Sequence, residues 1–593
     1  MRASHLLQTA VLCAAACVPA FAATPANAYY QHNLVSDTAG AADFTDPNLV
    51  NAWGIATSAT SPFWVSDGGT GLSTVYSSNG AVSATKVTVP PGTGGKSPSV
   101  ATGIVFNGTG GFQIQGHAPS FIFCTQDGTI SGWASAVNAT NAQLMVDNSS
   151  SGAVYDGLAI SGTTASGPGP YLYAANFHSG KIDVFDTNYK PLSLSGNFAD
   201  PSVPSGFAPF NIWNLGGKLY VTYAKQDANQ QYDVGGLGNG YVAVFDLNGN
   251  LLQHLVSGGQ LDSPWGVAIA PANFGAFSND LLVGNFESGL INAYDPNTGA
   301  FQGTLQDPSG NSIHIGGLWA LIVGNGGNGG DPNAVYFAAG PGNQQHGLLG
   351  SIQAAPLITS SSVGNAADGA AIIAPNSWIS IYGSNLAATT RNWTTKDLAP
   401  GTLPTALDGV SVMVNGKPAY VYYISPKQID VLTPVETSPA GPVTIQVSSN
   451  GLDGNVASVA DMPYSPAAFF YKSPYIAAVH SDNVTPIGPT TLFPNLSTPA
   501  KAGEPIVIYG TGFGDTNPEV SNGQISTGHL NLATPATVLI GGVPAQVSFA
   551  GLTSPGVYQF NVTVPASTPS GDTAVQITIG SFSSPAGAVI TVQ

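Results

Sequence analysis

Charged residues are scarce in this sequence. Asp, Glu, Lys and Arg make up 7% of the 593 residues, and 31 acidic residues against 13 Lys and Arg give a formal net charge of −18. A chain with so few charges disfavours helical bundles and charge-rich disorder. Its negative balance disfavours nucleic acid and anionic membrane surfaces as partners.

Cysteine is almost absent. Of the 3 cysteines, Cys13 and Cys17 fall in an N-terminal stretch with a basic start, an apolar run and small residues at its end. This pattern predicts a signal peptide over residues 1–22, with cleavage after residue 28 as an alternative and lipidation at Cys17 as a less favoured one. Cleavage leaves Cys124 as the only cysteine, which excludes an internal disulfide and predicts a buried thiol. No later apolar run is long enough to cross a bilayer. We therefore expect an exported protein of the periplasm, cell surface or medium, with no transmembrane segment.

Glycine and proline are abundant instead. The sequence has 74 Gly and 44 Pro, and 43% of its residues are hydrophobic. Apolar runs broken by turn-forming residues are typical of many short strands, so the predicted fold class is all-β. The chain is also too long for one ordinary core, which predicts more than one domain.

Two series of short motifs each recur six times in the first part of the chain. The first begins at Trp53 (WGIA) and returns at intervals of roughly 54 residues, and the second is a seven-residue segment such as GKIDVFD at Gly180. A unit of this length with several strands is one blade of a β-propeller, so the repeats predict six blades. The last unit stops about one strand short, and the segment 29–37 offers the strand that completes it. The sequence thus predicts a six-bladed β-propeller over residues 29–353.

From residue 355 onward a different duplication appears. WISIYGSNL (378–386) returns as IVIYGTGF (506–513), and VSVMVNGKPAYVYYIS returns as ATVLIGGVPAQVSFAG. Alternating strands joined by Asn-Gly and Gly-Gly turns predict two immunoglobulin-like β-sandwich domains, over residues 355–465 and 466–593.

Both regions carry a family resemblance. The motifs NLVSD, WGIA…FWVSD, FNIWNLGGKLYVTYAKQD, PWGVAIAPANFG and LLVGNF resemble an uncharacterised family of exported bacterial propellers, some of which end in a PEP-CTERM sorting tail. That resemblance implies the fold and export but no activity. The YG-small-x-apolar and V-x-G-x-P-A motifs of the C-terminal repeats resemble the IPT/TIG class of immunoglobulin-like domain, and as a pair they resemble a C-terminal module of exported soil-bacterial proteins.

Six positions of the first motif series are expected to surround one mouth of the propeller channel. They comprise three tryptophans and three polar residues: Trp53, Trp265 and Trp319, and Thr102, Asp156 and Asn211. An aromatic arc that faces a polar arc predicts a site for a carbohydrate or another partly apolar ligand, because indole offers a large face and one donor. In the alternative, the tryptophans pack between blades and plug the channel, which is the more usual role of large aromatic side chains.

A metal site is a second hypothesis for the mouth. YAANFHSG and LVGNFESG match residue for residue and place His178 and Glu287 in equivalent loops, and VSDGG adds Asp67. Such a ring could hold Ca²⁺ or Zn²⁺ and activate water, which would resemble lactonase-type and NHL-type propeller enzymes. No local motif fixes the ligand spacing, and a loop histidine is more often solvated or hydrogen-bonded than bound to a metal.

Three further carboxylates precede Asn or Gly in short turns. Asp186, Asp246 and Asp295 end the segments VFD, VFD and AYD. Aspartate at this position caps the backbone of a turn, so we expect a structural role and not paired acid/base chemistry.

These observations predict an exported, non-catalytic binding or adhesion protein that recognises a carbohydrate or another extracellular polymer at the channel mouth. A metal-assisted hydrolase of the lactonase kind is the alternative. A cell-envelope scaffold whose mouth binds nothing is the third hypothesis. Fold analogy supports all three, so the sequence leaves the choice open.

Overall fold

The computed structural model describes residues 27–162, 169–398, 401–435, 441–525 and 528–593. In this part of the chain the regular structure consists of β-strands and two short 3-10 turns, η2 (Ser149–Ser151) and η3 (Gly275–Phe277), with no α-helix. The all-β prediction is therefore confirmed. None of the described residues forms a helix with the length and apolar character to cross a membrane. The predicted signal peptide lies outside the described residues.

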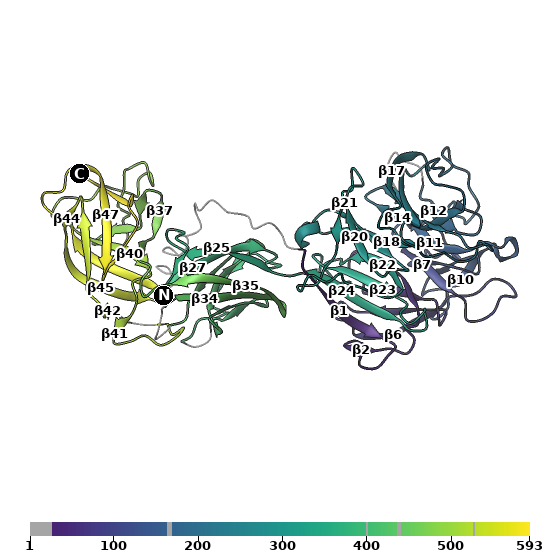
Figure 1. The fold of residues 1–593 in the computed structure, drawn as a ribbon, viewed down its shortest axis with the longest axis horizontal. Coiled ribbons are helices and arrows are strands. Elements are labelled where there is room, and N and C mark those ends of the chain that lie inside the picture. The colour runs from purple at the N-terminus through teal and green to yellow at the C-terminus, as the bar shows by residue number, and fades with distance from the viewer. Residues whose placement is uncertain (1–26, 163–168, 399–400, 436–440, 526–527) are drawn as a thin grey trace. The chain divides into compact units, whose positions relative to one another are not determined.

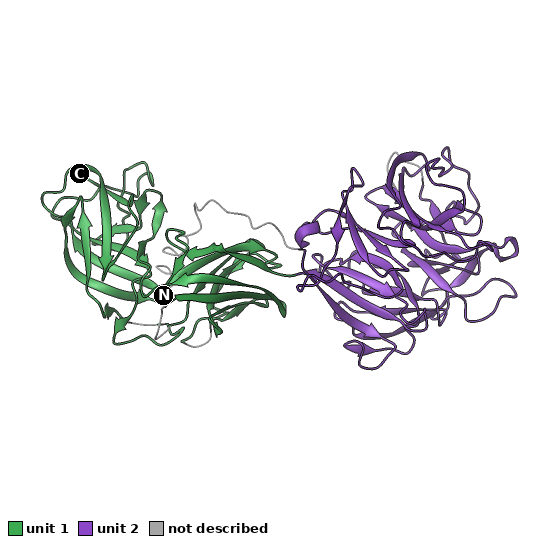
Figure 2. Cartoon of the chain, viewed as in Figure 1, with its two compact units in different colours: residues 1–26, 355–593 green, residues 27–354 purple. Residues whose placement is uncertain are grey.

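The described chain divides into two compact units, residues 27–354 and residues 355–593, which we call the N-terminal unit and the C-terminal unit (Figure 2). Within the described residues of the N-terminal unit, consecutive strands form six sheets (Figure 1). In chain order the sheets contain β3 (Ala52–Ala56), β4 (Phe63–Asp67), β5 (Leu72–Tyr76) and β6 (Val82–Thr88); β7 (Ala101–Phe106), β8 (Phe121–Thr125), β9 (Thr129–Trp133) and β10 (Gln143–Asp147); β11 (Tyr155–Ile160), β12 (Leu172–Asn176) and β13 (Lys181–Phe185); β14 (Phe207–Leu215), β15 (Lys218–Lys225), β16 (Gly240–Phe245) and β17 (Leu251–Ser257); β18 (Pro264–Ile269), β19 (Leu281–Asn285), β20 (Ile291–Tyr294) and β21 (Phe301–Thr304); and β22 (Leu318–Val323), β23 (Val335–Ala339) and β24 (Leu348–Ala354), joined by β1 (Tyr29–Ser36) and β2 (Phe44–Thr45).

The first strands of these sheets contact one another in order. β3 contacts β7, β7 contacts β11, and the series continues through β14, β18 and β22 back to β3, which closes a ring in a propeller-like arrangement. Glycine makes the close approach of neighbouring strands feasible. A Cβ atom on Gly157 would lie 2.1 Å from Asn211 Oδ1, and one on Gly266 would lie 2.4 Å from Trp319 O. Both glycines belong to the first motif series, so this motif marks where neighbouring sheets meet.

The N-terminal strand joins the sheet formed by the end of the unit. β1 pairs antiparallel with β24 in a register that runs from Tyr29 opposite Ala354 to Ser36 opposite Leu348. The Tyr29 side chain is buried, its hydroxyl donates to Phe274 O at 3.0 Å, and it accepts from Phe277 N at 3.2 Å. Because both phenylalanines belong to the loop between β18 and β19, Tyr29 also fastens the sixth sheet to the fifth.

The C-terminal unit contains two pairs of sheets in its described residues. In the first pair, one sheet consists of β25 (Leu357–Asn365), β27 (Trp378–Ser384), β33 (Gln428–Leu432), β32 (Tyr420–Ile424) and β28 (Arg391–Asn392). The other sheet consists of β26 (Ile372–Ile373), β35 (Leu452–Asp461), β34 (Gly441–Ser449), β30 (Val410–Val414) and β29 (Ala406–Leu407), with β31 (Lys417–Pro418) paired to β30. In the second pair, one sheet consists of β36 (Ala467–Ala468), β40 (Pro505–Thr511), β46 (Val557–Thr563), β45 (Gln546–Ser554), β42 (Leu530–Leu532) and β41 (Thr516–Asn517), with β39 (Ala478–His480) paired to β40. The other sheet consists of β37 (Phe470–Lys472), β38 (Tyr475–Ile476), β49 (Val589–Val592), β47 (Gly571–Ile579), β43 (Ala536–Ile540) and β44 (Val543–Pro544), with β48 (Phe582–Ser583) paired to β47.

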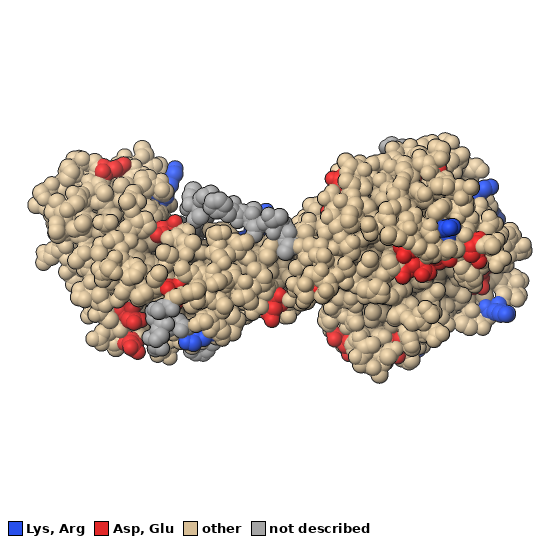
Figure 3. All heavy atoms as spheres, viewed as in Figure 1, with Lys and Arg blue, Asp and Glu red and all other residues tan. Residues whose placement is uncertain are grey.

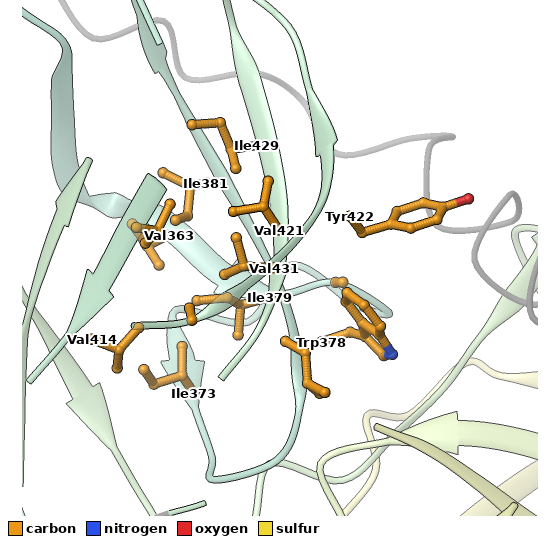
Figure 4. Packing of buried hydrophobic residues seen from close by; sticks show 14 of the residues in the cluster. Val363, Ile373, Trp378, Ile379, Ile381, Val414, Val421, Tyr422, Ile429 and Val431 are labelled. Carbon is orange, nitrogen blue, oxygen red and sulfur yellow. The ribbon is translucent and has the colours of Figure 1, made fainter. Parts of the chain in front are cut away.

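Alternating side chains build the core of each pair. In β30, Val410, Val412 and Val414 are buried and the residues between them are partly exposed, as expected for a strand with one covered face. Figure 4 shows Val414 packed in one cluster with Ile379 and Val431 of the facing sheet. This cluster extends to Val507 and Tyr509 of the second pair, and a further apolar cluster lies within the second pair.

We predict that Tyr29→Ala lowers the free energy of unfolding of the N-terminal unit by about 3–5 kcal/mol, because it removes a buried aromatic side chain and leaves a cavity between two sheets. Urea denaturation followed by tryptophan fluorescence measures the change. Tyr232→Ala is the matched control, since Tyr232 is 61% exposed. Removal of this exposed side chain should change the free energy of unfolding by less than about 0.5 kcal/mol. Equal effects of the two variants would contradict the closing role of β1.

Candidate functional site

One face of the N-terminal unit gathers the loops in which the predicted site residues lie. Antiparallel pairing places the start of each first strand beside the end of its second strand, as with Ala52 and Asp67, Tyr155 and Asn176, and Pro264 and Asn285. The loops that enter the first strands and the loops between second and third strands therefore open on the same face. We call this face the mouth.

The three predicted tryptophans form a compact cluster beneath the mouth. Trp53, Trp265 and Trp319 are each 1% exposed. Trp53 and Trp319 stack with ring centroids 3.6 Å apart, and Trp265 meets both rings edge-on at 6.5 and 6.0 Å. Phe286 covers Trp319 with a centroid distance of 3.8 Å. Because these rings cover one another, the packing alternative accounts for their positions.

The polar members of the predicted site link neighbouring sheets. Thr102 Oγ1 donates to Tyr155 O at 2.6 Å, and Asn211 Nδ2 donates to Trp265 O at 2.8 Å. Trp265 Nε1 in turn donates to Asp156 O at 3.1 Å. The side chains of Thr102, Asp156 and Asn211 are as deeply buried as the tryptophans. The structure thus brings all six residues into the centre of the unit, while ligand binding by them stays a prediction.

Two buried carboxyl groups lie among these contacts. Asp156 Oδ1 accepts from Gln126 Nε2 at 2.9 Å, but Asp156 Oδ2 and both oxygens of Asp67 have no hydrogen-bond partner in the described chain. Burial raises the pKa of both groups well above the ordinary range, and the Asp233 and Asp46 carboxylates add to the rise at Asp156 and Asp67, respectively. Burial therefore favours the neutral form of both side chains.

The predicted metal ligands do not gather into one site. His178 and Glu287 both border the loop between β15 and β16 (residues 226–239), but at different points of it: His178 Nδ1 lies 3.3 Å from Gln230 O, and Glu287 packs against Gly235. Asp67 belongs to the first sheet. Among the described residues, no three His, Cys, Asp or Glu side chains lie together in a way that could hold a metal ion.

The β15–β16 loop itself carries exposed apolar and recessed acidic side chains that sequence reasoning missed. Tyr232 and Leu237 are 61% and 72% exposed. Asp233 lies between these two residues in the sequence. Burial raises the pKa of Asp233 to about 6, Ser263 reduces this rise, and the Glu287 carboxylate increases it. Asp233 Oδ2 has no hydrogen-bond partner within the described residues. The length of the β15–β16 loop is the feature of the sequence that could have revealed it, because the corresponding loops of the first, third and fifth sheets are much shorter.

Hydrogen bonds hold this loop on both sides. Gln226 Nε2 donates to Phe177 O at 2.6 Å beside the third sheet, and Gly236 N donates to Asp262 Oδ1 at 2.6 Å beside the fifth. Within the loop, Asp227 N donates to Tyr232 O at 2.8 Å. These contacts fix the backbone on which Tyr232 is presented.

The turn aspartates have the role expected of them. Asp186 Oδ1 accepts from Asn188 N and Lys190 N, and Asp246 and Asp295 accept from backbone amides of their turns in the same way. These hydrogen bonds lower the pKa of the Asp186 and Asp295 carboxyls. The capping prediction is confirmed, and so is the buried Cys124 thiol.

Comparison with known proteins shows several viral relatives, two of which match over 330 residues. The uncharacterised protein R648 of Acanthamoeba polyphaga mimivirus is 34% identical over 330 residues, which cover 54% of this chain and 78% of that protein. The uncharacterised protein L690 of the same virus is 32% identical over 330 residues, covering 54% of this chain and 84% of that protein. No family model matches the chain. Because these relatives are viral, they do not support the resemblance to an exported bacterial family.

Solved structures give a weaker likeness. A streptogramin B lyase has a TM-score of 0.33 and 10% sequence identity, with 55% of this chain and 97% of that chain covered. A glucose dehydrogenase has a TM-score of 0.36 and 12% identity, with coverages of 54% and 98%. Structural similarity this low supports no conclusion about activity.

We predict that Asp156→Asn changes how stability depends on pH. A carboxyl with a raised folded-state pKa stabilises the fold below its unfolded-state pKa of about 4, and this stability is lost as the pH rises toward the folded-state pKa. As the pH rises across this window, the free energy of unfolding should therefore fall less steeply in the variant than in the wild type, by up to about 1.4 kcal/mol per pH unit. Urea titrations at several pH values between 4 and 8 measure it.

The control for this prediction is Asp186→Asn, because the pKa of Asp186 is lowered. That carboxyl stabilises the fold above its unfolded-state pKa of about 4, and this stability is lost only as the pH falls below that value. Asp186→Asn should therefore leave the pH dependence between pH 4 and 8 unchanged. An unchanged pH dependence in the Asp156→Asn variant would mean that Asp156 is ionised in the folded protein.

Proposed function

The chain belongs to the same family as the mimivirus proteins R648 and L690, and we propose that it is a binding protein whose N-terminal unit holds a neutral polysaccharide at the mouth without acting on it chemically. In this proposal the six sheets are the blades of a closed NHL/lactonase-like propeller, and the two sheet pairs are immunoglobulin-like domains of IPT/TIG type. The protein is exported and works at the cell surface or in the medium. The ring of strand contacts supports the propeller, and the alternating core strands support the sandwiches.

The observation that carries the proposal is an exposed tyrosine beside recessed acceptors. Tyr232 presents an aromatic face with a polar tip to solvent, and Asp233 follows it with an unpartnered carboxyl oxygen. Sugars combine apolar C–H faces with hydroxyl donors, so they match an aromatic ring set next to carboxylate acceptors. Asp262 and Glu287 extend the acceptor set on the neighbouring sheet, and both add to the pKa rise of Asp233.

Charge narrows the ligand class. The chain carries a net charge of −18, and Figure 3 shows acidic atoms gathered in a band on one face of the N-terminal unit. An anionic polymer would be repelled by such a surface, while a neutral polymer would not. The proposed site differs from the tryptophan cluster, whose rings are covered by their neighbours.

Two alternatives remain distinct from this proposal. A metal-assisted hydrolase would require His178 and Glu287 to reach one ion, although they border different points of the β15–β16 loop. A scaffold without a ligand would leave the exposure of Tyr232 without a function.

Binding to insoluble chitin and cellulose and to soluble dextran tests the proposal, with pull-down for the solids and affinity electrophoresis for dextran. We expect at least one of these neutral polymers to bind, and we expect Tyr232→Ala to weaken that binding at least about tenfold, equivalent to about 1.4 kcal/mol. Phe301→Ala is the matched control, because Phe301 is an aromatic residue 48% exposed on β21, outside the mouth loops.

Three outcomes would count against the site. Equal affinity of the wild type and Tyr232→Ala would exclude the loop, and binding to none of the polymers would favour the scaffold. Loss of binding in Trp265→Leu without a fall in thermal stability would place the ligand at the tryptophan cluster instead.

A further inference from the structure

A serine, a histidine and an aspartate form a continuous hydrogen-bonded chain at the edge of the fourth sheet. His254 Nδ1 lies 2.5 Å from Asp200 Oδ2, and His254 Nε2 lies 2.5 Å from Ser257 Oγ. The Asp200 side chain is fully buried, the His254 side chain is 23% exposed, and Ser257 is exposed. Burial therefore decreases from the carboxylate to the hydroxyl, in the order that a solvent-facing nucleophile requires.

A β-bulge makes this arrangement feasible. On a regular strand, residues three apart point to opposite faces, so His254 and Ser257 would not meet. In β17, Val256 pairs with Val242 and His254 pairs with Ala243, which leaves Leu255 as an extra residue. The extra residue shifts the alternation by one and turns Ser257 to the side of His254.

The hydrogen bonds fix which ring nitrogen can accept a proton. An ionised carboxylate only accepts hydrogen bonds, so His254 Nδ1 is the donor to Asp200. Asp200 Oδ1 is occupied separately by Ser202 N at 2.9 Å, which holds the carboxylate in place. In a neutral imidazole the other nitrogen is then an acceptor, and Ser257 Oγ donates to it. This is the protonation pattern of a general base poised on a hydroxyl.

Aromatic side chains and a glycine turn lie beside Ser257. Tyr241 lies directly opposite Ser257 in the strand register, its ring centroid is 6.1 Å from that of His254, and Phe207 packs against it at 4.9 Å. After Ser257 the chain turns through Gly258 and Gly259, both with positive φ. In the described chain the backbone amides of Gly259 and Gln260 have no protein acceptor, which leaves them available as oxyanion donors.

We propose that Asp200, His254 and Ser257 form an esterase site for uncharged carboxylic esters with a small acyl group. Ser257 Oγ attacks the ester carbonyl and bonds to its carbon, while the serine proton passes to His254 Nε2. The C–O bond to the alcohol then breaks, and His254 returns the proton to the leaving oxygen. Water attacks the acyl-serine, again with His254 as base, and restores Ser257, so that the net reaction converts ester and water into acid and alcohol. This proposal is independent of polymer binding by Tyr232.

The C-terminal unit provides an internal comparison. His480 Nδ1 lies 2.5 Å from Glu504 Oε1, and His480 Nε2 lies 3.0 Å from Thr498 Oγ1, which resembles the first site. However, the same Nε2 lies 3.2 Å from the carbonyl oxygen of Thr498. A carbonyl oxygen can only accept, so this nitrogen is placed to donate, and His480 is not set as a base for the threonine.

A fluorophosphonate probe and p-nitrophenyl acetate test the proposal on the full chain. We expect the probe to modify Ser257, as read by mass spectrometry of the labelled peptide, and the protein to release p-nitrophenol. Ser257→Ala should abolish both signals, and His254→Gln should slow both by roughly 100-fold or more. Thr498→Ala is the matched control and should change neither.

A cysteine variant tests the role of His254 as a base without relying on ester turnover. In Ser257→Cys, iodoacetamide should alkylate the new thiol at least about tenfold faster than in the double variant Ser257→Cys/His254→Gln, because the imidazole accepts the thiol proton. Equal rates in the two cysteine variants, probe attachment elsewhere than Ser257, or esterase activity that survives Ser257→Ala would each overturn the proposal.

Discussion

The close approach of the first strands around the centre of the N-terminal unit is the constraint on which the rest of that unit depends. Backbone atoms of one sheet come so near the next that a side chain on Gly157 or Gly266 would overlap it. Strands that meet this closely leave a central space that must be filled, because packed interiors tolerate few voids. Trp53, Trp265 and Trp319 fill it, and their contacts explain why three of the chain's 8 tryptophans share one local motif.

The same constraint determines where polar groups are left over. Thr102 and Asn211 donate to carbonyl groups of neighbouring sheets and so tie the ring together. Asp156 and Asp67 lie in the same buried region with oxygens that no described residue satisfies, and dry surroundings favour their neutral forms. The two sites proposed above use other residues, on the β15–β16 loop and at the edge of the fourth sheet.

The sequence predicted the all-β class from its turn-forming residues, and the aspartate caps from their position before Asn and Gly. It also located the six central residues, because a motif that recurs at one place in every repeat must occupy equivalent positions. It left packing and ligand binding open for the three tryptophans, since spacing alone does not distinguish a ring that covers a ligand from a ring that covers another ring. The contact between His254 and Ser257 was equally out of reach, because it depends on a bulge at Leu255 that reverses the usual alternation.

The pairing of β1 with β24 has a mechanical consequence. Tyr29 and Ala354, the outermost residues of the pair, lie opposite each other, so the chain enters and leaves the N-terminal unit at the same end of one antiparallel ladder. A tension applied between the two ends would load the hydrogen bonds one after another and not all at once, in the manner of a zipper. The ring that β1 and β24 close is thus expected to yield at low force when it is pulled from its ends.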